Sequence, residues 1–257
     1  MTFLMQNQAL SSNCDFVTNA LSEKSASRDF VDPLGGDGTV LLTLLRNNAI
    51  KSFHFNDPDP SWVEALNLIK HDPERVRQSI VTFLPTNSNV RGLFREDALP
   101  EEFLLKKLYS YGAYGEERAI IPGKNAAAKN AWLKRNWDQN KESLISYVSD
   151  ASSLLNSVPG EITCLPWEEA LPESVEDKFI WLDVYSHVSD GRSSKYHIFY
   201  EDINDVLREL RGSEWLAALP VSPEYDPILS WTQTTSPILM GKNYVPFVLV
   251  NSHSPAW

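Results

Sequence analysis

The apolar positions near the start of the chain change spacing in a regular order. Residues 28–34 (RDFVDPL) form a short apolar run typical of a buried strand, and residues 38–50 (GTVLLTLLRNNAI) place apolar side chains at helical spacing. Residues 51–57 (KSFHFND) alternate apolar and polar positions, as a half-buried strand does. Ser61 and Glu64 have the spacing of a capping box and predict the start of another helix. This order of strand, helix, strand and helix is typical of parallel βαβ units.

The chain returns to strands after a long polar middle. Residues 91–158 are predicted to be mainly helical, and Phe179 to Leu182 are continuously apolar, as in a strand buried on both faces. The other expected elements are strands at 160–167, 213–222 and 245–252 and helices near 15–21 and 201–210. We therefore expect an α/β fold, a Rossmann-like three-layer sandwich with a mostly parallel sheet, whose parts at 1–90 and 159–257 flank a helical insert.

The distribution of charge distinguishes one segment of the expected helical insert from the rest of the chain. A net charge of −11 over 257 residues disfavours a broad surface for non-specific nucleic-acid binding. Within this acidic chain, residues 124–141 (KNAAAKNAWLKRNWDQNK) concentrate cations, with Trp132 and Trp137 between them. The cations could hold a phosphate backbone while the tryptophans stack on bases, or the segment could be a solvated amphipathic helix. The candidate nucleic-acid-binding residues are Lys124, Lys129, Lys134 and Arg135.

Composition also bears on compartment, metal and partners. No apolar run approaches the length of a membrane span, and the first residues (MTFLMQNQALSSNC) lack the basic flank of a signal peptide, so we expect a cytoplasmic protein that does not engage a membrane. Cys14 and Cys164 have no histidine at ligand spacing, so we expect no metal site. An acidic surface would suit a protein partner, or would only keep the chain in solution.

A glycine-rich turn follows the first expected strand. Residues 33–38 (PLGGDG) contain three glycines, and glycine lets the backbone approach a ligand closely. In a parallel sheet this turn lies at the carboxyl end of a strand, where ligands bind. Asp57 ends the next strand, about 20 positions on, where nucleoside sites have an acid that accepts hydrogen bonds from ribose hydroxyls. A dinucleotide site would have a further glycine where Leu41 stands, and a turn without a ligand is the structural alternative.

These motifs, in this order, resemble those of the Dam-type DNA adenine methyltransferases. The matching residues are Asp32, Pro33, Leu34, Gly35, Gly36, Asp37, Gly38, Thr39 and Val40 in the first loop, Asn56 and Asp57 after it, and Tyr111, Gly112, Tyr114, Gly115, Ile121, Pro122, Gly123 and Lys124 in the insert. Residues 162–171 (ITCLPWEEAL) resemble the family's segment beside the adenine of the cofactor, and residues 180–187 (IWLDVYSH) fall where it has an Asp-Pro-Pro-Tyr tetrapeptide. The resemblance spans about residues 28–252.

The resemblance implies a transferase that uses S-adenosylmethionine and methylates adenine in DNA. The cofactor-binding residues would be Asp32, Pro33, Gly36, Gly38, Asp57 and Trp167, with Asp57 at the ribose and Trp167 beside the adenine. The catalytic residues would be Asp183, which accepts hydrogen bonds from the target amino group, and Tyr185, which could stack on the flipped base. The insert at 91–158 would correspond to a target-recognition region.

The tetrapeptide departs from the family pattern at the residues that serve the chemistry. Val184 and Tyr185 replace the two prolines, and Ser186 replaces the aromatic residue. Prolines fix the backbone that presents the carbonyl to the target base. Two hypotheses follow: a divergent but active methyltransferase, or a relative that lost methyl transfer and kept a binding or regulatory role. A nucleotide-dependent enzyme of unrelated chemistry on the same fold is a third, because fold does not fix function.

Overall fold

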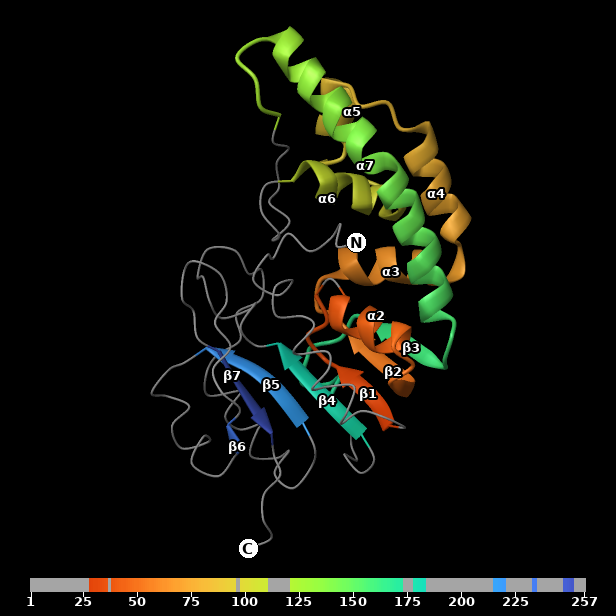
Figure 1. Ribbon diagram of the computed structural model, residues 1–257, viewed down its shortest axis with the longest axis vertical. Coiled ribbons are helices and arrows are strands. Elements are labelled where there is room, and N and C mark those ends of the chain that lie inside the picture. The colour runs from red at the N-terminus through yellow and green to blue at the C-terminus, as the bar shows by residue number, and fades with distance from the viewer. Residues whose placement is uncertain are drawn as a thin grey trace, which may run out of the picture. The chain divides into compact units, whose positions relative to one another are not determined.

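The structure is a computed structural model, and it describes residues 28–36, 38–95, 98–110, 121–172, 178–183, 215–220, 233–234 and 247–251. The chain divides into two compact units (Figure 1). The first, here called the sheet unit, comprises Asn7–Pro58 and Val158–Trp257, and the second, the helical unit, comprises Met1–Gln6 and Asp59–Ser157. The expected helices near 15–21 and 201–210 lie outside the described residues.

Among the described residues, the sheet unit contains a seven-stranded sheet with the order β3-β2-β1-β4-β5-β7-β6. Its strands are β1 (Arg28–Asp32), β2 (Ile50–Asn56), β3 (Gly160–Thr163), β4 (Lys178–Asp183), β5 (Trp215–Pro220), β6 (Gln233–Thr234) and β7 (Phe247–Asn251). The first five strands pair in parallel, and β7 runs antiparallel to both β5 and β6. The expected mostly parallel α/β sheet is confirmed. The strand order reverses between β1 and β4, and the carboxyl ends of these strands form the switch point at which such sheets bind ligands.

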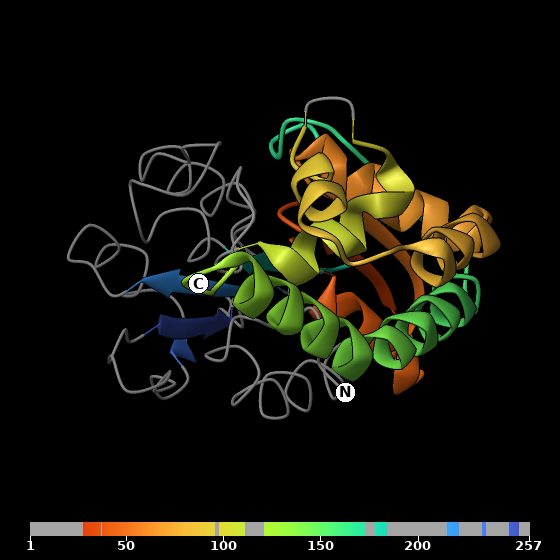
Figure 2. The same ribbon diagram turned by 90° about the horizontal axis from the view of Figure 1, so that it is seen from above.

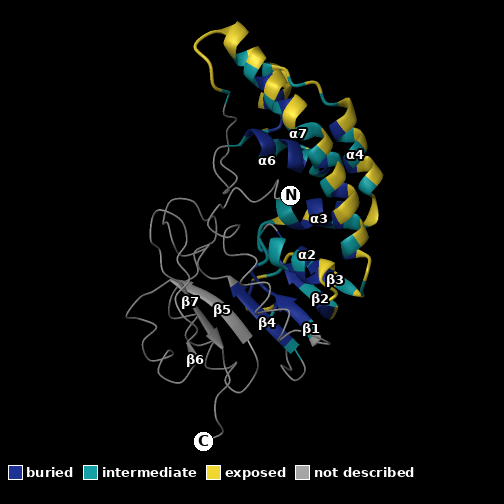
Figure 3. Cartoon of the chain, in the orientation of Figure 1, coloured by how far each residue is buried: buried dark blue, intermediate teal, exposed yellow. Residues whose placement is uncertain are grey.

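The centre of the sheet is apolar on both faces (dark blue in Figure 3). Four consecutive residues of β4 are each at most 2% exposed, as their unbroken apolar run predicts: Phe179, Ile180, Trp181 and Leu182. Phe30 of β1 stacks on Phe179, with ring centroids 6.3 Å apart. Helix α2 (Thr39–Arg46) connects β1 to β2 and buries four leucines: Leu41, Leu42, Leu44 and Leu45. The segment 38–50, predicted as one helix, therefore contains α2 and the first residue of β2.

The helical unit packs short helices against one long helix, α7 (Ala126–Leu155), which runs in green along their side in Figure 2. The shorter elements are α3 (Pro60–His71), α4 (Pro73–Thr82), α5 (Asn87–Gly92), the 3-10 helix η1 (Pro100–Glu102) and α6 (Phe103–Tyr109). The buried residues of α7 recur at spacings of three, four and seven, which places them on one face: Leu133, Trp137, Leu144, Val148, Ala151 and Leu155. Because α3 and α4 pack on α7, the helical unit begins at Asp59 rather than at residue 91.

The first turn of α3 differs from the sequence prediction. Asp59 is the N-cap residue, and its Oδ1 accepts a hydrogen bond from the backbone N–H of Ser61 at 2.9 Å. Pro60 occupies the first helical position, where its missing N–H costs nothing and its fixed φ suits the helix. The predicted capping box of Ser61 and Glu64 is therefore wrong, because the Asp-Pro pair ahead of it starts the helix two residues earlier.

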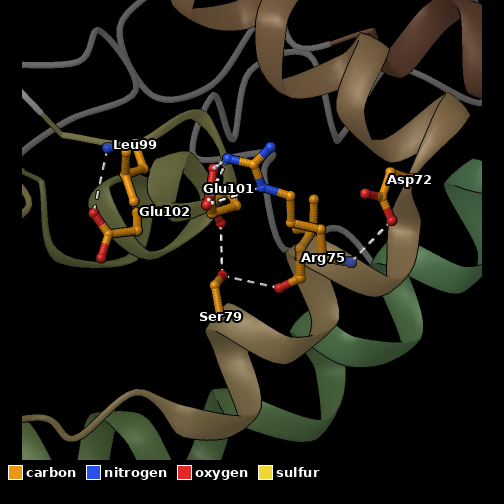
Figure 4. Close-up of polar contacts among 7 residues, drawn as sticks. Asp72, Arg75, Ser79, Leu99, Glu101 and Glu102 are labelled. Carbon is orange, nitrogen blue, oxygen red and sulfur yellow. Dashed lines mark hydrogen bonds and ion pairs between the residues drawn. The ribbon is translucent and has the colours of Figure 1, made fainter.

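An ion pair between the largely buried Glu101 and the half-exposed Arg75 ties η1 to α4 (Figure 4). Glu101 is 9% exposed, and its carboxylate accepts two hydrogen bonds from the guanidinium of Arg75, from Nε at 3.0 Å and from Nη2 at 2.9 Å. Ser79, one turn further along α4, donates its hydroxyl proton to the backbone oxygen of Glu101 at 2.7 Å. These contacts fix η1, and with it the start of α6, on the surface of α4.

Arg75→Met is expected to lower the free energy of unfolding by about 2 kcal/mol, because it leaves the desolvated Glu101 carboxylate without its cation. Urea denaturation followed by circular dichroism measures the change. Arg77→Met is the matched control, since Arg77 pairs with the exposed Glu74 and should cost less than about 1 kcal/mol. Equal losses in the free energy of unfolding of the two variants would show that burial of Glu101 does not strengthen its ion pair relative to the exposed pair.

Candidate functional site

The glycine turn folds against the end of β2 within the sheet unit. The N–H of Gly35 donates to the backbone oxygen of Asn56 at 2.8 Å, and the N–H of Gly36 donates to Oδ2 of Asp57 at 2.6 Å. Gly36 and Gly38 have φ values of 62° and 69°, in the left-handed region that favours glycine. Gly38 is also the N-cap residue of α2. The turn is therefore shaped by its own glycines and held by the two residues that end β2.

Gly35 and Gly36 serve different purposes in this turn. A Cβ atom on Gly35 would lie 2.6 Å from Cε2 of Phe55 and 2.7 Å from the backbone oxygen of Asn56, so only glycine fits between the turn and β2. At Gly36 the nearest described heavy atom to such a Cβ is the backbone oxygen of Leu34, at 4.0 Å. The sequence predicts Gly36 and Gly38 as cofactor-binding residues and gives Gly35 no separate role, whereas the structure shows that Gly35 allows the turn to approach its own sheet closely.

Asn56 joins the glycine turn to the segment that follows β3. Its side chain is fully buried, and Nδ2 donates to the backbone oxygens of Pro33, at 3.0 Å, and Leu165, at 3.1 Å. Oδ1 accepts from the N–H of Leu165 at 2.8 Å and from the Thr163 hydroxyl at 2.9 Å. The backbone partners fix the orientation of the amide, because carbonyls only accept and an N–H only donates. The turn after β1 and the turn after β3 thus share one buried side chain.

The hydroxyl of Thr163 links the side chain of Asn56 to that of His54, two residues earlier in β2. Nε2 of His54 lies 2.8 Å from Oγ1 of Thr163. Because Thr163 donates its proton to Asn56, its oxygen accepts from a proton on Nε2 of His54. Burial lowers the pKa of His54, against a smaller opposing effect of Glu161, so the ring is neutral at pH 7. A neutral ring with its proton on Nε2 extends the polar chain without adding charge.

The predicted cofactor-binding residues meet at one edge of the sheet. Asp32 ends β1 and is 1% exposed, and Asp57 directly follows β2 and is 3% exposed. Trp167, two residues beyond Leu165, begins a turn after β3 and is 7% exposed. Gly36 lies beside Asp57 and is partly exposed. Since β1, β2 and β3 are neighbours, the carboxyl ends of three parallel strands bring these residues together.

Of the two predicted catalytic residues, Asp183 lies within the described residues, on the other side of the switch point from the glycine turn. Asp183 is the last residue of β4, which pairs with β1, so its backbone stands at the same sheet edge as the glycine turn. The backbone of Asp183 pairs with Ala218 of β5. Tyr185 lies outside the described residues.

The predicted nucleic-acid-binding residues lie at the start of α7 in the helical unit. Lys124, Lys134 and Arg135 are exposed, and Lys129 is partly buried. Five positions along a helix correspond to a rotation of about 140° beyond one full turn, so Lys129 and Lys134 point to different sides of α7. These cations surround the end of the helix and do not form a single strip.

The tryptophans of α7 pack inside the helical unit. Trp137 is 6% exposed and meets Phe83 edge to face, with ring centroids 5.4 Å apart. Trp132 meets Tyr109 at 6.2 Å, and burial raises the pKa of the Tyr109 hydroxyl. The interpretation that Trp137 stacks on nucleic-acid bases is therefore wrong, and a phosphate-binding role for the cations of this segment stays a prediction.

Two absences apply to the described residues alone. Within them, no three His, Cys, Asp or Glu side chains gather closely enough to hold a metal ion. None of the helices in this part of the chain combines the length and the apolar character that crossing a bilayer requires. Cys164 is exposed and forms no disulfide within the described residues, and its Sγ lies 3.7 Å from the backbone oxygen of Pro58; Cys14 lies outside the described ranges.

Comparison with known proteins gives similarity of structure only. No protein-family model and no curated protein matches the chain. Two solved structures of the rRNA methyltransferase aviRa from Streptomyces viridochromogenes are similar to it. The 1.5 Å structure has 13% identity and a TM-score of 0.44, covering 95% of this chain and 84% of that one. The 2.4 Å structure has 14% identity and a TM-score of 0.39, covering 92% and 84%.

The fold is a Rossmann-like α/β fold. Its sheet has five parallel strands in doubly wound order with an antiparallel β7 beside β5. The resemblance to the Dam-type family stays a hypothesis from the sequence motifs.

Proposed function

We propose that the sheet unit binds S-adenosylmethionine at the carboxyl ends of β1, β2 and β3, as a divergent relative of the Dam-type adenine methyltransferases. The observation that carries the proposal is the 2.6 Å hydrogen bond from the N–H of Gly36 to Asp57, which sets a carboxylate beside a partly exposed glycine where an added Cβ would come no closer than 4.0 Å to a described atom. A carboxylate offers about four acceptor positions, so this bond is compatible with further hydrogen bonds from ribose hydroxyls.

Charge supports a cationic ligand at this turn over a phosphate. Asp32 and Asp57 are both buried at the strand ends that flank the turn. Carboxylates attract the positive sulfonium of S-adenosylmethionine and repel the phosphates of a nucleotide or a dinucleotide. In this proposal Pro33, Gly36 and Gly38 shape the turn against the cofactor, and Trp167 lies beside its adenine.

Methyl transfer requires in-line placement of a nucleophile against the cofactor's methyl group, which is mainly a positioning problem. In the proposed transferase the Asp183 carboxylate accepts hydrogen bonds from the target amino group, and Tyr185 stacks on the flipped base. The cations Lys124, Lys129, Lys134 and Arg135 then bind the phosphates of DNA.

Calorimetric titration of the full chain with S-adenosylmethionine tests the proposal. Binding is expected with a dissociation constant between about 1 µM and 1 mM, the usual range for enzyme substrates. ATP and NAD serve as controls, because they contain the same adenosine with phosphates in place of the sulfonium, and both should bind more weakly. No heat of binding at millimolar S-adenosylmethionine, or tighter binding of ATP, would overturn the proposal.

A second candidate function is cofactor binding without methyl transfer, in a regulatory protein that acts through a partner. The observation that favours it is the replacement of both prolines of the tetrapeptide by Val184 and Tyr185. Transfer of a labelled methyl group from S-adenosylmethionine to adenine-containing DNA separates the two candidates. Label on the DNA supports the transferase, and tight cofactor binding with no label on any DNA supports the regulatory protein.

A further inference from the structure

We propose that Asn56 is a positioning residue that keeps the two turns of the cofactor site at a fixed separation. This inference rests on the proposed function, because it assigns the turn after β1 to one end of S-adenosylmethionine and the turn after β3 to the other. Asn56 itself is buried and need not touch the cofactor.

Every hydrogen-bond donor and acceptor position of the Asn56 side chain is occupied. A primary amide has two donor protons and two acceptor lone pairs. In Asn56 all four are engaged, by the backbone oxygens of Pro33 and Leu165 and by the Leu165 N–H and the Thr163 hydroxyl. With 0% of the residue exposed, no solvent is at hand to replace a lost partner.

The hydrogen-bond partners of the Asn56 side chain come from the turn after β1, from the segment after β3, and from Thr163 at the end of β3. Pro33 opens the glycine turn that contains Gly36, and Leu165 lies two residues before Trp167. The backbone of Asn56 adds a further contact, since its oxygen accepts from the N–H of Gly35 at 2.8 Å. One residue at the end of the middle strand therefore sets the distance between the ribose acid and the adenine turn.

No other residue type can make the same set of bonds in this space. Aspartate has the volume of asparagine and keeps both acceptors, but its carboxylate has no proton for the oxygens of Pro33 and Leu165 and repels them. Alanine leaves every partner without its hydrogen bond. Asn56→Asp therefore breaks the donor half of the network alone and is the sharpest test of positioning.

The test compares the affinity of the full chain for S-adenosylmethionine and for adenine, measured by calorimetry below the unfolding temperature of each variant. Asn56→Asp is expected to weaken S-adenosylmethionine binding at least about tenfold and adenine binding by less, because adenine reaches only the turn after β3 whereas the whole cofactor reaches both turns. A residue that merely stabilises the fold would lower the unfolding temperature and leave the affinity of the folded protein unchanged.

Ser52→Ala is the matched control, since Ser52 also lies in β2 and donates a side-chain hydrogen bond, to Asp29, at the opposite end of the strand. Both affinities should stay within about twofold of the wild type. Thr163→Val, which removes a single bond to Asn56, provides an intermediate case if Asn56→Asp does not fold. Its S-adenosylmethionine affinity should fall about threefold.

The outcomes separate the two proposals. A wild type that binds the cofactor, with an Asn56→Asp or Thr163→Val variant of unchanged affinity, overturns the positioning role and leaves the proposed function intact. Equal losses for adenine and S-adenosylmethionine also overturn it, because one turn would then suffice. A wild type that binds no S-adenosylmethionine overturns both.

Discussion

Asp57→Ala is expected to abolish measurable S-adenosylmethionine binding, with a loss of at least about 100-fold. Hydrogen bonds to a charged group contribute about 1.5–3 kcal/mol each, and the substitution removes the acceptor of two ribose hydroxyls. It also removes the partner of the Gly36 N–H, so the turn loses the contact that fixes it against β2. Calorimetric titration of the purified variant measures the loss, and circular dichroism establishes that the protein is folded.

Two further substitutions separate charge from shape at this position. Asp57→Asn can still accept the proton of the Gly36 N–H, so the turn should persist while cofactor affinity falls at least about tenfold. Asp72→Asn makes the same charge change at the N-cap of α4, in the helical unit, and should leave cofactor affinity unchanged. An Asp57→Ala variant with wild-type affinity would remove Asp57 from the cofactor site and refute the ribose role.

The spacing of apolar residues in the sequence predicts the strands and helices at the start of the sheet unit and the buried strand β4. The alternation from strand to helix to strand over β1, α2 and β2 is visible in the period of apolar residues, and the unbroken apolar run of β4 predicts its burial on both faces. The start of α3 was missed because two start signals overlap, and Asp59 with Pro60 outcompetes the capping box behind it.

The boundary of the helical unit depends on contacts that no local pattern specifies. The sequence of α3 is equally suited to pack on the sheet or on another helix, because an apolar stripe does not identify its partner. Its neighbour α7 comes much later in the chain, and only the structure shows that the two pack together. The same reason explains Trp137, which its cationic neighbours on α7 suggested as a base-stacking residue and which packs against Phe83.

The sequence predicts candidate residues for a site but not how they are held together. The glycines and Asp57 are residue types that suit a nucleoside ligand, and the structure brings them to one sheet edge. The role of Asn56 was not predictable, because its partners Pro33, Thr163 and Leu165 lie in separate parts of the sequence. Asn56 falls at a polar position of the alternating β2 sequence, so no local pattern shows that it is buried and needs hydrogen-bond partners.

Gly35→Ala is expected to lower the free energy of unfolding by about 3 kcal/mol, the upper part of the range for overpacked sites. The added Cβ would lie 2.6 Å from Cε2 of Phe55 and 2.7 Å from the backbone oxygen of Asn56. Phe55 is 0% exposed and fixed in the core, and the carbonyl belongs to β2, so neither neighbour can move without disturbing the sheet. Urea denaturation followed by tryptophan fluorescence measures the loss.

Gly36→Ala is the matched control, because it adds the same methyl group one position later in the same turn. The space there is open, with the nearest described atom 4.0 Å away, and the cost is only the strain of an L-residue at a φ of 62°. That strain is about 1 kcal/mol, so the control should lose about a third of what Gly35→Ala loses. A Gly35→Ala variant no less stable than Gly36→Ala would contradict the packing of the turn against β2. Since the hydrogen bond from Gly35 to Asn56 depends on that packing, the same result would also weaken the structural basis for the cofactor site.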